Sequence, residues 1–139
     1  MTSPKILLIE DDRSTAIALR NSVASEIPDS EIVMVAKTHE EVVLLDGQPF
    51  DLILADLMLP DTDHPEEIIE HCQRQFPQTP VIVVSGLSDP EAARRIAAMP
   101  NTYGYFSKTA AQNAPADIGI WIRKTIEHIP VGCVLLTAL

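Results

Sequence analysis

Five short apolar segments, separated by stretches with helical spacing, are the feature that most constrains the fold of this chain. They cover Lys5–Ile9, Glu31–Ala36, Leu52–Ala55, residues 81–84 and residues 103–106. The run Val-Ile-Val-Val at 81–84 contains no polar residue. Strands without polar alternation are typical of parallel sheets that are buried on both faces. The pattern therefore predicts a parallel sheet of five strands.

Apolar residues between these segments recur every three or four positions, as they do on the buried face of a helix. The stripes comprise Ala16, Leu19, Val23 and Ile27; Ile68, Ile69, Cys72 and Phe76; Ala92, Ala93, Ile96 and Ala97; and Ile118, Trp121, Ile122, Thr125 and Ile129. Helix starts are predicted where capping boxes occur, with Pro65 and Pro90 in the first turns. The capping boxes are Thr38 with Glu41, Asp63 with Glu66, and Ser88 with Glu91.

Alternation of strands and helices, with right-handed crossovers, predicts an open α/β fold. We expect a doubly wound, five-stranded parallel sheet in the flavodoxin-like order 2-1-3-4-5, with helices on both faces. Its ligand crevice lies at the carboxyl ends of the strands, where the first and third strands meet. We expect one domain over residues 1–130, followed by an apolar tail or truncated linker over residues 131–139.

Composition excludes some function classes. The chain has 20 acidic residues against 10 Lys and Arg, for a net charge of −10, which argues against nucleic-acid binding by this chain itself. Its two cysteines lack zinc-site spacing. No segment has the pattern of a signal peptide or the length of a membrane span. We therefore expect a cytoplasmic protein that does not enter a membrane.

Acidic side chains follow the first and third predicted strands. Glu10 and Asp11 end one apolar run and Asp56 ends the other. Buried carboxylates that crowd together need a proton or a cation, and Mg²⁺ prefers oxygen ligands. We predict that Asp11 and Asp56 bind Mg²⁺ directly, with Glu10 acting through water and the backbone carbonyl of Met58 supplying another oxygen.

A neighbouring acidic residue has a simpler interpretation. Asp12 lies where the first helix begins, so we expect it to cap that helix rather than to bind metal, and a capping role for Asp11 is also left open.

The predicted site also suits phosphoryl transfer, with Asp56 as the nucleophile. Such transfer needs in-line positioning and positive charge on the phosphoryl oxygens. Lys108 ends the fifth strand and would contact one oxygen, while the hydroxyl of Ser85 and the backbone N–H of Gly86 would contact another. Taken singly, Ser85 is better explained as an ordinary residue at the start of a loop, and Lys108 as a solvated lysine. Their joint position at neighbouring strand ends favours the site.

Four motifs in this order resemble the response-regulator receiver domain of two-component signalling. They are residues 9–12 (Ile-Glu-Asp-Asp), 56–61 (Asp-Leu-Met-Leu-Pro-Asp), 84–86 (Val-Ser-Gly) and 104–108 (Gly-Tyr-Phe-Ser-Lys), and the resemblance extends from Lys5 to Ile129. It implies that a sensor histidine kinase or phosphotransfer protein phosphorylates Asp56, while Glu10 and Asp11 hold Mg²⁺. The domain would then be a phosphoacceptor switch rather than an enzyme, with at most weak self-phosphorylation and self-dephosphorylation.

The resemblance also implies a switch. Ser85 would move toward the phosphoryl group, Tyr105 would swing inward as a readout, and the surface of the fourth helix and fifth strand would change. The alternative for Tyr105 is a fixed, half-exposed strand residue. A homodimer on activation is left open, as is a DNA-binding domain in a longer parent protein.

Three places depart from the common receiver pattern, and in one of them residues 99–102 (Met-Pro-Asn-Thr) replace the usual small-residue turn before the fifth strand. Thr109 stands where many receivers have a proline after a cis bond, so a trans Lys108–Thr109 bond is expected. The stretch at residues 105–110 resembles receivers of the LuxR-type subfamily, which often lack that proline. His64 replaces a usual glycine, and we expect it to begin the following helix without a catalytic role.

Three other functions remain as alternatives. The strongest is a receiver-like interaction module that works without phosphorylation. A haloacid-dehalogenase-like phosphohydrolase would have a second aspartate two residues after the nucleophile, where this chain has Met58. A flavodoxin would bind phosphate after the first strand, where Glu10, Asp11 and Asp12 would repel it.

Overall fold

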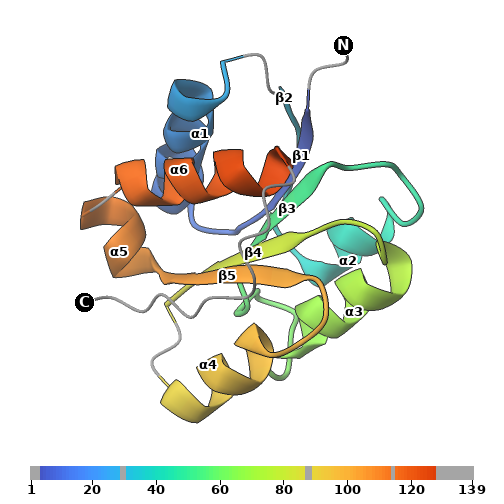
Figure 1. The fold of residues 1–139 in the computed structure, drawn as a ribbon. Coiled ribbons are helices and arrows are strands. Elements are labelled where there is room, and N and C mark those ends of the chain that lie inside the picture. Colours follow the sequence, from blue (N-terminus) through green and yellow to red (C-terminus); the bar gives the residue numbers. More distant parts are fainter. Residues whose placement is uncertain (1–3, 29–30, 87–88, 114, 128–139) are drawn as a thin grey trace.

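The computed structural model describes residues 4–28, 31–86, 89–113 and 115–127, in which strands and helices alternate along the chain (Figure 1). The proposed tail at residues 131–139, together with Ser88 and Ile129, lies outside the described residues. No helix within these ranges combines the length and apolar character that crossing a membrane requires.

The five strands form one sheet in the order β2-β1-β3-β4-β5, and every neighbouring pair is parallel. They are β1 (Lys5–Ile9), β2 (Glu31–Ala36), β3 (Leu52–Ala55), β4 (Val81–Ser85) and β5 (Thr102–Ser107). All residues of β3 and β4 are buried. The predicted parallel α/β architecture is confirmed, and the last two strands are slightly longer than the sequence suggested.

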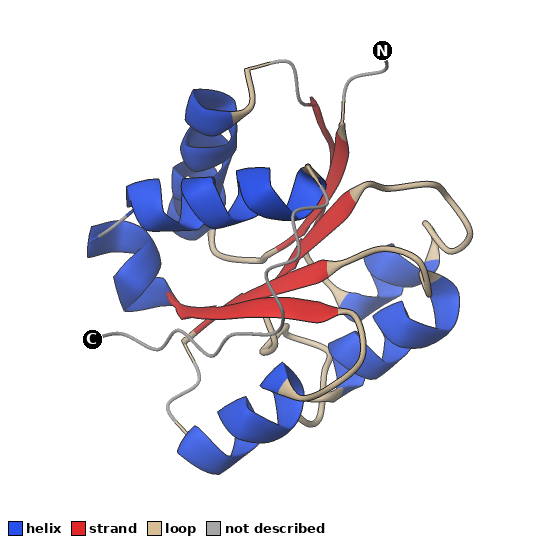
Figure 2. Ribbon diagram, viewed as in Figure 1, coloured by secondary structure: helices blue, strands red, loops and turns tan. Residues whose placement is uncertain are grey.

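Helices cover both faces of the sheet (Figure 2). They are α1 (Arg13–Glu26), α2 (His39–Val43), α3 (Glu67–Gln75), α4 (Pro90–Ala97), α5 (Lys108–Asn113) and α6 (Pro115–Ile126). Alternation along β1 divides the interior into two cores, because successive side chains of a strand point to opposite faces. Ile6 and Leu8 pack with α1 and α6, whereas Leu7 and Ile9 pack with α2, α3 and α4.

Helix starts agree with the sequence in one place and differ in two. Thr38 caps α2 by accepting a hydrogen bond from the Glu41 N–H at 3.1 Å, as predicted. The expected start of α3 at Asp63 is wrong, because the helix begins at Glu67 and Asp63 lies in the preceding loop. The hydroxyl of Thr62 accepts a hydrogen bond from the Leu59 N–H and donates one to the Leu59 carbonyl. These bonds stabilise a turn, and the helix begins only after it.

The same loop contains His64 and Pro65, so neither begins the helix, contrary to expectation. At α4 the cap is Asp89, whose carboxylate accepts from the N–H groups of Glu91 and Ala92. Pro90 is the first residue of that helix, as predicted.

Helix α5 was missed by the sequence analysis, which expected a single helix after the last strand. Its sequence, Lys-Thr-Ala-Ala-Gln-Asn, has no large apolar residue and therefore shows no stripe. The Lys108–Thr109 bond is trans, since the described residues contain no cis peptide bond.

Candidate functional site

The carboxyl ends of β1 and β3 bring the acidic residues together. The backbone N–H of Asp56 donates to the carbonyl of Ile9 at 2.8 Å, and the N–H of Glu10 donates to the carbonyl of Ala36 at 2.9 Å. These bonds continue the sheet by one residue and fix where the side chains begin. As a result, Glu10, Asp11 and Asp56 each place a carboxylate oxygen within 4.8 Å of the other two.

The three carboxylates differ in exposure. Glu10 is 2% exposed and Asp56 is 3% exposed, whereas Asp11 is exposed to solvent. Burial, and then the negative charge of Asp56, raises the pKa of Glu10 to about 8. This shift favours the protonated form of Glu10 at neutral pH, and a further cation bound beside it would favour the charged form.

Lys108 is the cation of this site in the described structure. Its Nζ lies 3.1 Å from Asp56 Oδ2 and 3.1 Å from Glu10 Oε2. Partial burial by itself would lower the pKa of Lys108, but the charges of Asp56 and Glu10 outweigh it and raise that pKa. The predicted position of Lys108 at the end of β5 thus brings its ammonium between two buried carboxyl groups.

The donor set fits a magnesium ion. Glu10 Oε1 is buried and has no hydrogen-bond partner among the described residues. Its other oxygen, Oε2, accepts from the Asp12 N–H and from Lys108. A buried oxygen without a partner is costly. Three neighbouring carboxylates, of which Asp11 is exposed to solvent, are suitable ligands for Mg²⁺ that keeps several waters.

Met58 contacts the site through a different atom from the one predicted. Its N–H donates to Asp56 Oδ1 at 3.3 Å, and its side chain is 45% exposed. The role of its carbonyl as a metal ligand stays a prediction.

Asp12 caps α1 instead of joining the acidic group. Its carboxylate accepts hydrogen bonds from Ser14 and from the side chain and N–H of Thr15. The bonds from Thr15, and then that from Ser14, lower the pKa of Asp12. The expectation that Asp12 is a cap is confirmed.

Ser85 and Gly86 lie at the end of β4, next to β5, and Lys108 directly follows β5. Ser85 is completely buried and pairs in register with Ser107 of β5. Gly86 lies close to the lysine, because a Cβ built on it would be 3.8 Å from Lys108 Cδ, an ordinary van der Waals contact. Alanine would therefore fit at Gly86.

A family model identifies the kind of domain. The model described as "Response regulator receiver domain" matches residues 6–116. This chain belongs to the response regulator receiver domain family. No curated protein matches it significantly.

Solved structures of receiver domains have the same fold. A CheY-like response regulator receiver domain protein from Methanospirillum hungatei JF-1 is 21% identical and has a TM-score of 0.75, with 91% of this chain and 96% of that chain covered. The non-phosphorylated receiver domain of the stress response regulator RcsB from Escherichia coli is 15% identical, with a TM-score of 0.74 and coverage of 99% and 100%. A signal receiver domain of an HD domain-containing protein from Pseudomonas fluorescens Pf-5 is 21% identical, with a TM-score of 0.72 and coverage of 91% and 96%.

Tyr105 of this receiver domain is already inside the protein. It is 1% exposed and packs in the core that contains Val83 and Ile96. Burial, and then the charge of Asp56, raises the pKa of its hydroxyl, and Ser85 partly offsets that shift. The alternative of a half-exposed strand residue is therefore wrong.

Two features of the receiver domain were not anticipated from the sequence. Asp61, in the loop after Asp56, accepts hydrogen bonds from the N–H groups of His39 and Glu40 at 2.7 and 3.0 Å, so this loop is joined to the start of α2. The second feature is a pocket lined by Glu10 and Asp11 together with several arginine and lysine side chains. No sequence signal joins these residues, because they come from separate elements.

Proposed function

We propose that Asp56 accepts a phosphoryl group from a sensor histidine kinase or phosphotransfer protein, and that the modification switches the α4–β5 surface. One observation carries this proposal. Three carboxylates lie within 4.8 Å of one another, and the Lys108 ammonium lies 3.1 Å from Asp56. This arrangement supports a nucleophile, a divalent cation and a fixed positive charge at one strand edge.

In this proposal each residue has a defined task. An Asp56 carboxylate oxygen attacks phosphorus as the P–N bond to the donor histidine breaks, and the histidine nitrogen takes up the electron pair of that bond. Lys108 neutralises one phosphoryl oxygen, while Ser85 and the Gly86 N–H donate to another. Mg²⁺, held by Glu10, Asp11, Asp56 and the Met58 carbonyl, would supply the remaining charge neutralisation.

The proposed switch starts from a buried Tyr105. Phosphorylation adds charge and bulk next to Ser85 and draws its hydroxyl toward the phosphoryl group. The space between Ser85 and Tyr105 then changes, and so does the packing of β5 against α4. This is a two-state equilibrium that a covalent modification biases. Because Tyr105 is buried, we propose that phosphorylation fixes its position instead of bringing it in from solvent.

The finer classification is part of the same proposal. Thr109, at the position where many receivers have a proline, supports placement in the LuxR-type subfamily. The chain would act as a switch and not as a turnover enzyme, and would meet its kinase in the cytoplasm. Any DNA-binding domain would belong to a longer parent protein. We also propose that the chain forms a homodimer on activation.

A second candidate is an interaction module that needs no phosphorylation. The burial of Tyr105 favours it, because the structure holds the proposed readout residue in an inward position. The two candidates differ in one measurable respect, namely whether Asp56 becomes modified.

Intact mass spectrometry tests the choice. The wild-type protein is incubated with acetyl phosphate and Mg²⁺, beside Asp56→Asn and the matched control Asp63→Asn, whose aspartate lies in the exposed loop before α3. We expect one phosphoryl group on the wild type and on Asp63→Asn, and none on Asp56→Asn. Equal incorporation by all three proteins would show that Asp56 is not the acceptor, and incorporation by none would favour the interaction module.

A further inference from the structure

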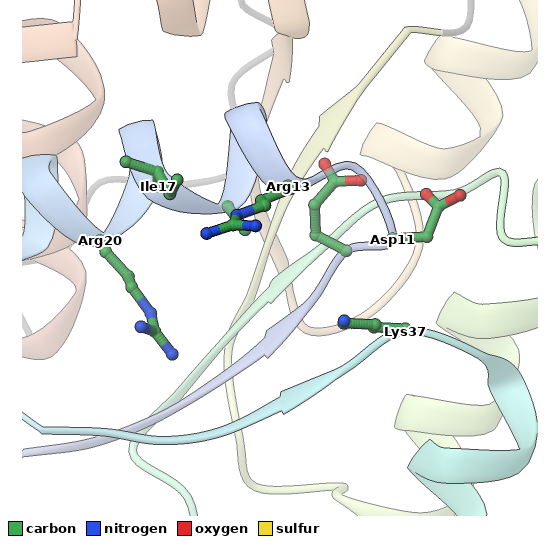
Figure 3. A pocket seen from close by; sticks show the side chains of 7 residues that line it. Asp11, Arg13, Ile17, Arg20 and Lys37 are labelled. Carbon is green, nitrogen blue, oxygen red and sulfur yellow. The ribbon is translucent and has the colours of Figure 1, made fainter.

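A pocket of about 330 Å³ lies beside the acidic site, between the first turns of α1 and the residue that follows β2. We call it the cation pocket, and its charged lining residues are the cations Arg13, Arg20 and Lys37 and the carboxylates Glu10 and Asp11. Figure 3 shows Arg13 and Arg20 projecting from α1 and Lys37 extending from the neighbouring segment. Three cations from two separate elements therefore surround one hollow.

None of these three cations has a charged partner among the described residues. Elsewhere in the described ranges, Arg95 pairs with Glu66, Arg123 with Glu26, and Lys108 with the acidic site. Lys5, Arg74, Arg94 and Lys124 also have no charged partner there, so these three cations are set apart by lining one pocket, in a chain with 20 acidic and 10 basic residues. In such a chain an unpaired group of three cations is a local exception to the acidic surface.

The pocket also has an apolar side. Ile17 lines it and is 48% exposed, and Ala16 lies next to it. Guanidinium groups bind carboxylates and phosphates through paired hydrogen bonds, and an exposed isoleucine beside them adds contact area for the carbon part of a ligand. Glu10 and Asp11 repel negative charge, so an anion would bind on the side formed by the three cations.

We propose that the cation pocket binds a carboxylate or phosphate group. The group would belong either to a free small oxyanion or to an acidic segment of another protein. This site is distinct from the acceptor Asp56, which does not line the pocket. The inference does not depend on phosphorylation and would hold even if the receiver domain worked only as an interaction module.

Amide chemical shifts test the proposal on the complete chain at constant ionic strength. Three probes are titrated separately: inorganic phosphate, succinate and a hexaglutamate peptide. We expect saturable shifts at Arg13, Ile17, Arg20 and Lys37. Saturation by phosphate or succinate assigns a free oxyanion as the ligand, and saturation by hexaglutamate alone assigns an acidic protein segment.

Matched variants separate a site from general attraction. Arg20→Ala should weaken binding about tenfold, because it removes one charge-assisted contact. Lys37→Gln, which removes the charge but keeps a polar side chain, should also weaken binding. Arg74→Ala removes an exposed charge at the end of α3, away from the pocket lining, and should leave binding unchanged. Linear shifts without saturation for every probe, or an equal loss with Arg74→Ala, would overturn the proposal.

Discussion

Two groups of carboxylates in this receiver domain have opposite environments. The capping carboxylates, Asp12 and Asp61, accept hydrogen bonds from backbone N–H groups at the starts of α1 and α2. Their pKa values are lowered. The site carboxylates, Glu10 and Asp56, are buried beside each other, and the pKa of Glu10 is raised to about 8.

The two environments favour different protonation states of a carboxyl group. A helix start offers backbone N–H groups that favour the charged form of a carboxylate. A charged capping carboxylate therefore stabilises the folded protein. At the ends of β1 and β3, burial and the charge of Asp56 disfavour the charged form of Glu10, and Lys108 offsets only part of that cost. Ionisation of Glu10 thus reduces the stability of the fold unless a further cation binds, and a strongly shifted pKa of this kind is typical of functional residues.

The largest effect is expected from Glu10→Gln. Because the pKa of Glu10 rises from 4.5 to about 8 on folding, the folded state holds more protons than the unfolded state between these pH values. The free energy of unfolding should therefore fall as pH rises through this window, by up to ~1.4 kcal/mol per pH unit from this group. The glutamine side chain cannot ionise, so the variant should lose that slope and be the more stable protein at pH 8.

Urea denaturation at several pH values without divalent cations checks this expectation. The raised pKa of Lys108 does not contribute to the slope, since its stabilisation is complete below 10.5 and is lost only as pH rises through the higher folded-state value. An unchanged slope in Glu10→Gln would mean that Glu10 is ionised in the folded protein at neutral pH.

Sequence reasoning reached the site because the acidic residues directly follow buried strands. Apolar runs that end at Glu10 and Asp56 identify the strands, and a parallel α/β sheet brings the ends of neighbouring strands together. Lys108 and Ser85 followed from the same rule. These residues depend on strand periodicity and sheet geometry, which are both local properties of the sequence.

The features that sequence reasoning missed depend on contacts between distant elements. The bonds from Asp61 to the start of α2 join positions more than 20 residues apart and leave no periodic pattern. Tyr105 could not be placed inside or outside, because a strand aromatic at the sheet edge can pack on a helix or remain in water. The start of α3 was misplaced because Thr62 stabilises a turn that competes with the predicted cap.

An intermediate effect is expected from Lys108→Met. The substitution keeps most of the side-chain length and leaves Glu10 and Asp56 without their shared cation, so it should destabilise the protein by about 3 kcal/mol at pH 8. The loss should be smaller at pH 6, where one carboxyl group takes up a proton. Lys5→Met removes an exposed charge at the start of β1 and serves as the matched control in the same denaturation series. Equal losses in both variants would contradict the role given to Lys108.

The smallest effect, with the opposite sign to that of Glu10→Gln, is expected from Asp61→Ala. The variant leaves the N–H groups of His39 and Glu40 without their acceptor and should lose about 1 kcal/mol of stability. Although desolvation raises the pKa of Asp61, the hydrogen bonds from His39 and Glu40 lower it overall. The stabilisation should therefore be present above the ordinary value of 3.8 and disappear as pH falls through the lower folded-state value. Denaturation of Asp61→Ala and of the neighbouring Asp63→Ala, from neutral to acidic pH, distinguishes a specific cap from a general loss of negative charge. If Asp63→Ala lost as much stability with the same pH dependence, capping carboxylates and exposed carboxylates would be equivalent in this loop.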